Sequence, residues 1–542
     1  MRFPTISADK IVKGKQTKFD GLNHNLGAGD GELWDMRNLT SDYYPLLATR
    51  QKRKLLRTLT KANGITAHGG LAWVDGTKFY YNGTEKGTVT DGKKTFAAIG
   101  AFLCIFPDAK YYDVVAGEFG SLESRWSGAS LTFTNGTLYG EAAEANCIQC
   151  TGVTWSSYFK AGDAVTISGC TTHPENNKTP IIREIDGDKL YFYEHVFTLD
   201  GDGGDEPYTE SGTLKVERTV PEISYVCENE NRLWASDGKR IFASKLGDPF
   251  NWNVFDGLDT DSWCWPTDAA GIIGGITGAV SFLGYPIFFK EDHIYKVYGS
   301  TPVNFEVNGG PDLGVASGSA KSLAIAGETL FYLSPAGFVA YAGGIPRPIG
   351  AAFGLERQKN AVGGSDGLKY YVSYQDAAGA WKLAVYDTQK GMWHIEDTTQ
   401  AVGFCRLNSD TYMLDSAGKM QLIGTILSSG GTAEADFQWS AEFGDNTDDE
   451  PNKKGVSRLQ IRLELDANAT ATVYLKFDST GDWVQAGQAM PAGVKRSYVL
   501  PIIPRRCDHY RMKITGTGGC RIYSIAREYY TGSDLKSQTG RN

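Results

Sequence analysis

Several features are missing from this sequence of 542 residues, and each absence excludes a class of protein. No apolar run approaches the ~20 residues that a membrane-spanning helix needs, since five glycines interrupt the weakly polar stretch 269–286. The basic N-terminus, residues 1–20, lacks the apolar core of a signal peptide. We therefore expect neither a membrane segment nor signal-peptide secretion.

An excess of basic charge is also missing. The chain carries 54 Lys and Arg against 63 Asp and Glu, a net charge of −9, whereas a general nucleic-acid coat protein is expected to be basic. The nine cysteines are odd in number and irregularly spaced, which disfavours a framework of paired disulfides. Folding in a reducing cytoplasm is the better interpretation.

Catalytic signatures are missing as well. The sequence contains no His-Glu-x-x-His, no Gly-x-Ser-x-Gly, no phosphate-binding loop and no dinucleotide fingerprint. We predict no catalytic residues, no cofactor and no metal. One pattern leaves zinc open as an alternative, because Cys147, Cys150, Cys170 and His173 have formally suitable spacing. The segment 199–206 resembles a calcium loop but lacks the required glycine and closing glutamate, so we interpret it as a hairpin tip.

Glycine and aromatic residues are abundant. There are 65 glycines, roughly 12% of the chain where about 7% is usual, and aromatics make up 12%. Many glycines fall in tight turns between apolar strands, as in Asp75-Gly76. Six such units recur, at 71–113, 231–244, 280–298, 323–341, 367–395 and 411–423.

Recurrence of this kind predicts an all-β fold containing a degenerate β-propeller of about six blades. A β-sandwich array is the alternative. The propeller would occupy 64–116 and 221–430, interrupted by an inserted small β-barrel domain at 117–220. Strict alternation of polar and apolar residues from Ser457 predicts a C-terminal antiparallel β-sandwich with a polar tail, residues 431–542. Residues 1–63 are expected to form an extended N-terminal arm.

A basic run lies in this arm. Between Arg50 and Lys61 there are six basic residues and no acidic one. A run of one sign is typical of either a solvated strand or a surface for an acidic partner. The candidate partner-binding residues are Arg50, Lys52, Arg53, Lys54 and Arg57.

Two stretches carry a family resemblance. Ser-Lys-Leu-Gly-Asp-Pro-Phe-Asn-Trp-Asn (244–253) precedes the glycine-rich 269–276 and a strand pair around 289–295. This order, over about 20–430, resembles the packaged-DNA stabilisation proteins of tailed bacteriophages, connector or nozzle proteins below the portal. The N-terminal run Trp-Asp-Met-Arg-Asn-Leu (34–39) also resembles structural proteins of phages of Gram-positive hosts.

The resemblance implies a non-enzymatic virion structural protein, made in the bacterial host cytoplasm and located in the tail or neck. It would form a homo-oligomeric ring, with a hexamer as the candidate stoichiometry, that retains and conducts the packaged double-stranded DNA. Its partners would be further copies of itself and portal, adaptor or other tail proteins, which the basic run would contact by charge complementarity.

Two other functions remain open. A receptor- or glycan-binding tail protein would use exposed aromatics of the insert, namely Trp126, Trp155 and Tyr158, to stack on sugars. A propeller enzyme acting on polysaccharide would need two placed carboxylates, and the sequence offers no reason to prefer any pair among its 63 acidic residues.

Overall fold

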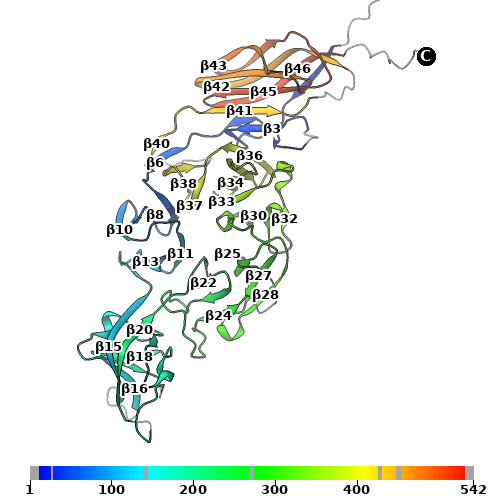
Figure 1. Cartoon of the computed structure of the whole chain (residues 1–542). Helices are drawn as coiled ribbons and strands as arrows, with labels where there is room; N and C mark the ends of the chain where they lie inside the picture. The colour runs from blue at the N-terminus through cyan, green and yellow to red at the C-terminus, as the bar shows by residue number, and fades with distance from the viewer. Residues whose placement is uncertain are drawn as a thin grey trace, which may run out of the picture. The chain divides into compact units, whose positions relative to one another are not determined.

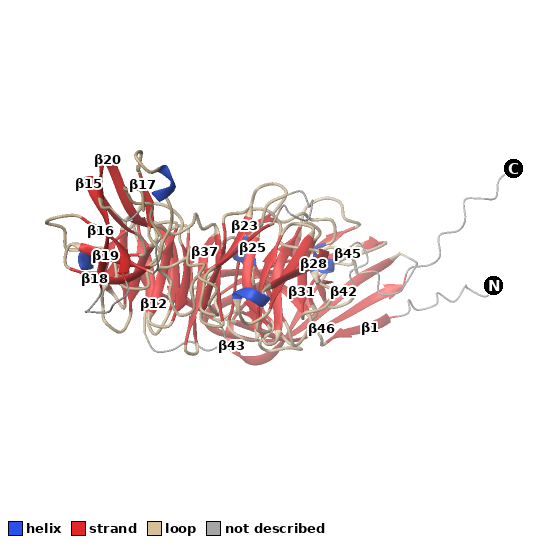
Figure 2. Ribbon diagram, turned by 90° about the horizontal axis from the view of Figure 1, so that it is seen from below, coloured by secondary structure: helices blue, strands red, loops and turns tan. Residues whose placement is uncertain are grey.

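The computed structural model describes residues 11–25, 29–137, 144–193, 196–203, 206–267, 274–424, 430–446 and 453–531, and in these ranges the chain is all-β (Figure 2). The helical segments within them are short 3₁₀ turns: η1 Trp155–Ser157, η2 Pro174–Asn176, η3 Pro302–Asn304, η4 Ala320–Ser322 and η5 Gly350–Phe353. The predicted all-β fold is confirmed. In the described part of the chain, no helix is long and apolar enough to cross a membrane.

Two compact units divide the chain. The first contains Met1–Ile65 and Lys321–Asn542, and the second contains Thr66–Ala320. Both units contain antiparallel sheets whose strands follow one another in chain order, which is how the blades of a β-propeller are built.

Four of these blade-like sheets belong to the second unit. Their strands are β7 Ala62–Ala67, β8 Leu71–Asp75, β9 Lys78–Tyr81, β10 Thr84–Thr88; β11 Thr95–Ile99, β12 Phe102–Phe106, β13 Lys110–Asp113, β14 Phe119–Ser121; β21 Tyr225–Asn229, β22 Arg232–Ser236, β23 Arg240–Ala243, β24 Trp263–Pro266; and β25 Gly278–Phe282, β26 Tyr285–Phe289, β27 His293–Tyr298, β28 Glu306–Pro311.

Three more lie in the first unit. They are formed by β29 Ala324–Ala326, β30 Thr329–Ser334, β31 Gly337–Tyr341, β32 Arg347–Pro348; β33 Lys359–Ser365, β34 Lys369–Gln375, β35 Trp381–Asp387, β36 Met392–Asp397; and β37 Ala401–Leu407, β38 Asp410–Asp415, β39 Lys419–Ile423 with β6 Lys54–Thr58 and β40 Thr432–Ala433. The described residues thus contain seven such sheets where the sequence predicted about six, because 71–113 forms two separate sheets.

Strand β12 shows why neighbouring sheets pack. Side chains alternate across a strand, so a strand buried on both faces serves two cores. Leu103 and Ile105 pack against Val74 and Phe79 of the preceding sheet. Cys104 and Phe106 point the other way and join a cluster with β22 and β23. Each blade-like sheet therefore depends on its neighbours for burial.

The inserted domain interrupts this series after β14. Its strands are β15 Ser124–Thr137, β16 Glu144–Gln149, β17 Thr166–Ser168, β18 Ile182–Asp186, β19 Lys189–Phe192 and β20 Tyr208–Arg218, ordered β17-β20-β15-β16-β19-β18. The amides of Val165 and Ile167 donate to the carbonyls of Pro180 and Lys178. The two edges of this sheet consequently lie side by side, as in a small curled barrel.

A buried ion pair joins the insert to the motif at 244–253. Arg218 at the end of β20 pairs with Asp163, whose side chain is fully buried. The Asn251 side chain donates to Asp163 (3.0 Å) and accepts from the Ala164 amide (3.1 Å). The motif that carried the family resemblance thus has a structural role, holding the insert to the second unit.

Residues 11–58 are not a separate arm, because their strands enter two sheets of the first unit. An eleven-stranded sheet contains β1 Ile11–Gln16, β2 Gly21–Leu22, β3 Glu32–Arg37, β4 Leu39–Thr40, β5 Leu47–Thr49, β41 Gln438–Phe443, β42 Lys454–Phe477, β43 Val484–Pro501, β44 Arg506–Cys507, β45 Tyr510–Thr517 and β46 Cys520–Thr531. Strand β1 pairs with β46, and β3 lies beside β41 (Figure 1). Strand β6 completes the sheet of β37–β39.

We predict that the Asp163–Arg218 pair stabilises the insert's attachment. Asp163→Asn keeps the shape but leaves Arg218 buried without a counter-ion, and breaking a buried pair typically costs about 3–5 kcal/mol. Urea unfolding should show a loss of that size, with faster hydrogen exchange in β17 and β20. The control Arg125→Gln breaks a pair whose arginine is 59% exposed and should cost less than about 1 kcal/mol. Equal losses in both variants would contradict the prediction.

Candidate functional site

The five predicted partner-binding residues separate into two groups. Arg50 and Arg53 are buried, with 6% and 5% of their surface exposed. Lys52 and Arg57 are exposed and Lys54 is half-buried. The interpretation of the run as one continuous contact surface is therefore wrong for Arg50 and Arg53, whose charged groups face the protein interior.

Both buried arginines pair with carboxylates far away in the sequence. Arg53 contacts Glu396 at 2.6 Å and Asp397 at 2.8 Å, both at the end of β36. Arg50 holds Glu434 with two hydrogen bonds of 2.8 and 3.0 Å and lies over the ring of Phe437. Such two-pronged arginine–carboxylate contacts are among the stronger hydrogen bonds in proteins.

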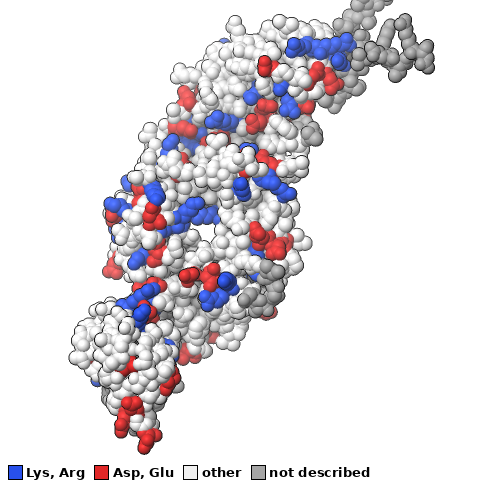
Figure 3. Space-filling view, in the orientation of Figure 1, with Lys and Arg blue, Asp and Glu red and all other residues white. Residues whose placement is uncertain are grey.

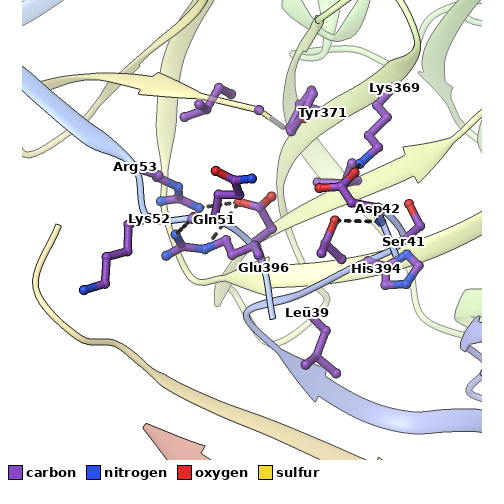
Figure 4. A pocket seen from close by; sticks show the side chains of 15 residues that line it. Leu39, Ser41, Asp42, Gln51, Lys52, Arg53, Lys369, Tyr371, His394 and Glu396 are labelled. Atoms are coloured by element: carbon purple, nitrogen blue, oxygen red, sulfur yellow. Dashed lines mark hydrogen bonds and ion pairs between the residues drawn. The ribbon is translucent and has the colours of Figure 1, made fainter. Parts of the chain in front are cut away.

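A small cavity lies beside this ionic network (Figure 4). Its volume is about 20 Å³, which is room for about one water molecule. Lys369 pairs there with Asp42, and the Ser41 hydroxyl donates to Asp387 at 2.5 Å. The buried His394 and Glu396 complete this side of the lining.

Burial and neighbouring charges determine the protonation of these groups. Burial alone would raise the pKa of Asp397, but Arg53 lowers it below its ordinary value. For Glu434 the same opposition is resolved by the hydrogen bond and charge of Arg50, which lower its pKa. Burial, with Lys369 nearby, lowers the pKa of His394 to about 4. At neutral pH the site therefore contains paired ions and a neutral imidazole, which is a structural rather than a catalytic arrangement.

A larger cleft of about 460 Å³ opens on the other side of residues 49–54. Its walls include Tyr43, Phe437, Glu464 and Arg521. These groups already contact one another or the ionic network: Arg521 lies 4.5 Å from the Tyr43 ring centre and 3.6 Å from Glu464. The cleft is wide enough for a small polar ligand, but its aromatic faces are covered by the protein's own cations.

The formal zinc pattern is not assembled. Cys147 packs with Tyr191, whereas Cys170 lies in the core of the insert, and His173 bonds to Asp200 at 2.8 Å. Burial raises the pKa of both thiols to about 11, the opposite of what metal ligation requires. Across the described residues, no group of three or more His, Cys, Asp or Glu is placed to hold a metal. The calcium-like loop includes residues 204–205, which lie outside the described residues.

Two of the three aromatics proposed for sugar stacking are in the core. Trp126 is 7% exposed and Trp155 is fully buried, in contact with each other at 4.9 Å between ring centres. Tyr158 is 39% exposed. The prediction that Trp126 and Trp155 form an exposed stacking surface is wrong, because they fill the centre of the curled sheet.

No family model and no curated protein matches the sequence. Solved structures resemble it weakly. BamB from Moraxella catarrhalis is 10% identical, with a TM-score of 0.31 over 69% of this chain and 97% of that one. The computationally designed Ika8 protein is 9% identical, with 0.33 over 69% and 99%. An exo-β-1,3-galactanase from Phanerochaete chrysosporium is 8% identical, with 0.23 over 61% and 98%. Likenesses this low carry no argument about function.

We predict that the network of Arg53 contributes strongly to stability. Arg53→Met should lower the free energy of unfolding of the first unit by about 3–5 kcal/mol, because Glu396 and Asp397 lose their buried counter-ion. Urea unfolding measures this. The control is Lys52→Met, which breaks a pair with Asp436 whose side chains are both 44% exposed and should cost less than about 1 kcal/mol. If Arg53→Met behaved like Lys52→Met, the network would not have the role assigned to it.

We predict a loss of stability on mild acidification. The fold lowers the pKa of His394 from its ordinary value of 6.5 to about 4, so between these values the unfolded chain binds a proton that the folded chain does not. The free energy of unfolding should fall as pH decreases from 6.5 to 4, by on the order of 3 kcal/mol. Unfolding of His394→Gln followed across this range should lack that decrease; an unchanged pH dependence would refute the assignment.

Proposed function

We propose that this chain is a non-enzymatic structural protein of a tailed-phage virion, a subunit of a homo-oligomeric nozzle or connector ring that retains and conducts packaged DNA. The motif order of the sequence supports this proposal, together with a fold of repeated blade-like sheets. The observation that carries it is an exposed apolar patch at one end of the sheet β25–β28.

The patch consists of Leu283, Tyr285, Tyr298 and Val303. Tyr285 and Tyr298 face each other across β26 and β27, with ring centres 4.9 Å apart. Leu283 lies in the preceding turn and Val303 in η3, which directly follows β27. Their exposed fractions are 55% for Leu283, 38% for Tyr285, 36% for Tyr298 and 81% for Val303. Clustered aliphatic and tyrosine side chains in solvent are typical of protein contact surfaces.

The charge distribution is compatible with DNA in transit. The face drawn in Figure 3 intersperses basic and acidic side chains, and the net charge is −9. Tight binding of duplex DNA would require a continuous basic surface that neutralises phosphates. A conduit should let DNA slide, so weak attraction suits the proposed role.

We expect the patch to be required for assembly. The double variant Leu283→Ser with Val303→Ser should stay monomeric in native mass spectrometry and fail to enter particles, while its thermal unfolding remains unchanged. Ile345→Ser with Leu355→Ser makes the same chemical change at side chains that are 87% and 99% exposed and is the control. Images of particles containing the wild-type chain should show it as a ring below the portal. A wild-type chain that stays monomeric and is absent from particles would contradict the proposed function.

A further inference from the structure

We propose that the outer edge of β43 is a docking site for an acidic, extended segment of a partner protein, which adds to the sheet as a further strand. The proposal concerns the eleven-stranded sheet alone and does not depend on the phage assignment. The open edge, its charge and its exposed apolar side chains support it independently.

The first observation is the free edge. Strand β43 is 18 residues long and pairs with β42 along its length, from Arg458 with Pro501 to Leu475 with Val484. In the described part of the chain, β43 has no second neighbouring strand. A long strand with one unpaired side presents backbone donors and acceptors to any extended chain of suitable sequence.

The second observation is unbalanced charge. Residues 484–507 contain Lys495, Arg496, Arg505 and Arg506 and no acidic residue, in a chain of net charge −9. The contacts of the first three are with aromatic rings: Lys495 lies 3.7 Å from the Tyr523 ring centre, Arg496 4.5 Å from Tyr498 and Arg505 5.8 Å from Phe477. Their charge is not neutralised by a carboxylate in the described residues, in contrast to Arg50 and Arg53.

The third observation is apolar exposure on the same segment. Val494 is 82% exposed, Val499 47%, and Ile503, just beyond the strand, 91%. Lys495, Arg496 and Ser497 are exposed as well, so both faces of β43 reach solvent here. Lysine on an edge strand commonly discourages aggregation, but aggregation control alone does not account for β-branched side chains left in water beside it.

Charge decides between the possible occupants. A second copy adding through its own β43 would bring Lys495 and Arg496 near their equivalents, and one adding through β1 would bring Lys13 and Lys15. Like charges across neighbouring strands are unfavourable. A segment that alternates acidic and β-branched residues would instead pair its carboxylates with Lys495 and Arg496 and cover Val494 and Val499.

The test uses the full chain and two synthetic ten-residue peptides, one alternating valine with glutamate and one alternating valine with lysine. Fluorescence anisotropy at low salt should show the glutamate peptide binding at least about tenfold more tightly. Hydrogen exchange should slow at the amides of residues 495–500 when that peptide is bound. Lys495→Glu with Arg496→Glu should reduce its affinity by about tenfold or more.

The control variant Arg357→Glu with Lys359→Glu makes the same charge change at two exposed residues before and in β33 and should leave peptide affinity unchanged. Glutamate-peptide binding without slower exchange in β43, or binding that the control reduces equally, would overturn the proposal in favour of non-specific attraction. Tighter binding of a duplex DNA oligonucleotide, lost in the β43 variant, would also overturn it and indicate a nucleic-acid surface. Failure of ring assembly in the wild type would refute the proposed function but not this site.

Discussion

The buried pairing of Arg50 and Arg53 with carboxylates is the interaction on which the first unit depends. Residues 50–53 are the crossing between β5, in the eleven-stranded sheet, and β6, in the sheet of β37–β39. At this crossing the chain has no ladder of strand hydrogen bonds, and its cations pair with Glu396, Asp397 and Glu434 instead. Removing one member leaves uncompensated charge in the interior, so the pairing specifies the crossing even where its net contribution to stability is modest.

The blade-like sheets were predictable because their signal is local. Glycine turns between alternating apolar strands identify a hairpin within about twenty residues, as at Gly76, which adopts a φ of 60° between β8 and β9. The number of sheets was less accessible, since β7 and β10 are edge strands with weak apolar patterns. The contribution of β6 to a sheet formed more than 340 residues later has no local signal at all.

The site was harder to predict because charge patterns do not report burial. The run at 50–61 reads as a surface, and nothing within it distinguishes Arg53, which is 5% exposed, from Lys52. A signal did exist at long range: residues 431–450 contain seven acidic residues and no basic one, and Glu434 among them holds Arg50. Trp126 and Trp155 failed as predicted surface residues for a related reason, since a curled sheet buries the same aromatic side chains that a flat, exposed sheet would present.

The interleaving of early and late strands has a consequence for biosynthesis. The second unit is one continuous stretch of sequence, so all of its strands leave the ribosome before the rest of the first unit is made. By contrast, β1, β3 and β6 must wait for partners among β39, β41 and β46. During translation the N-terminal strands therefore remain unpaired with their edges exposed, a state that favours misassembly. Completion of the chain, rather than emergence of its first domain, is then the event that ends its dependence on chaperones.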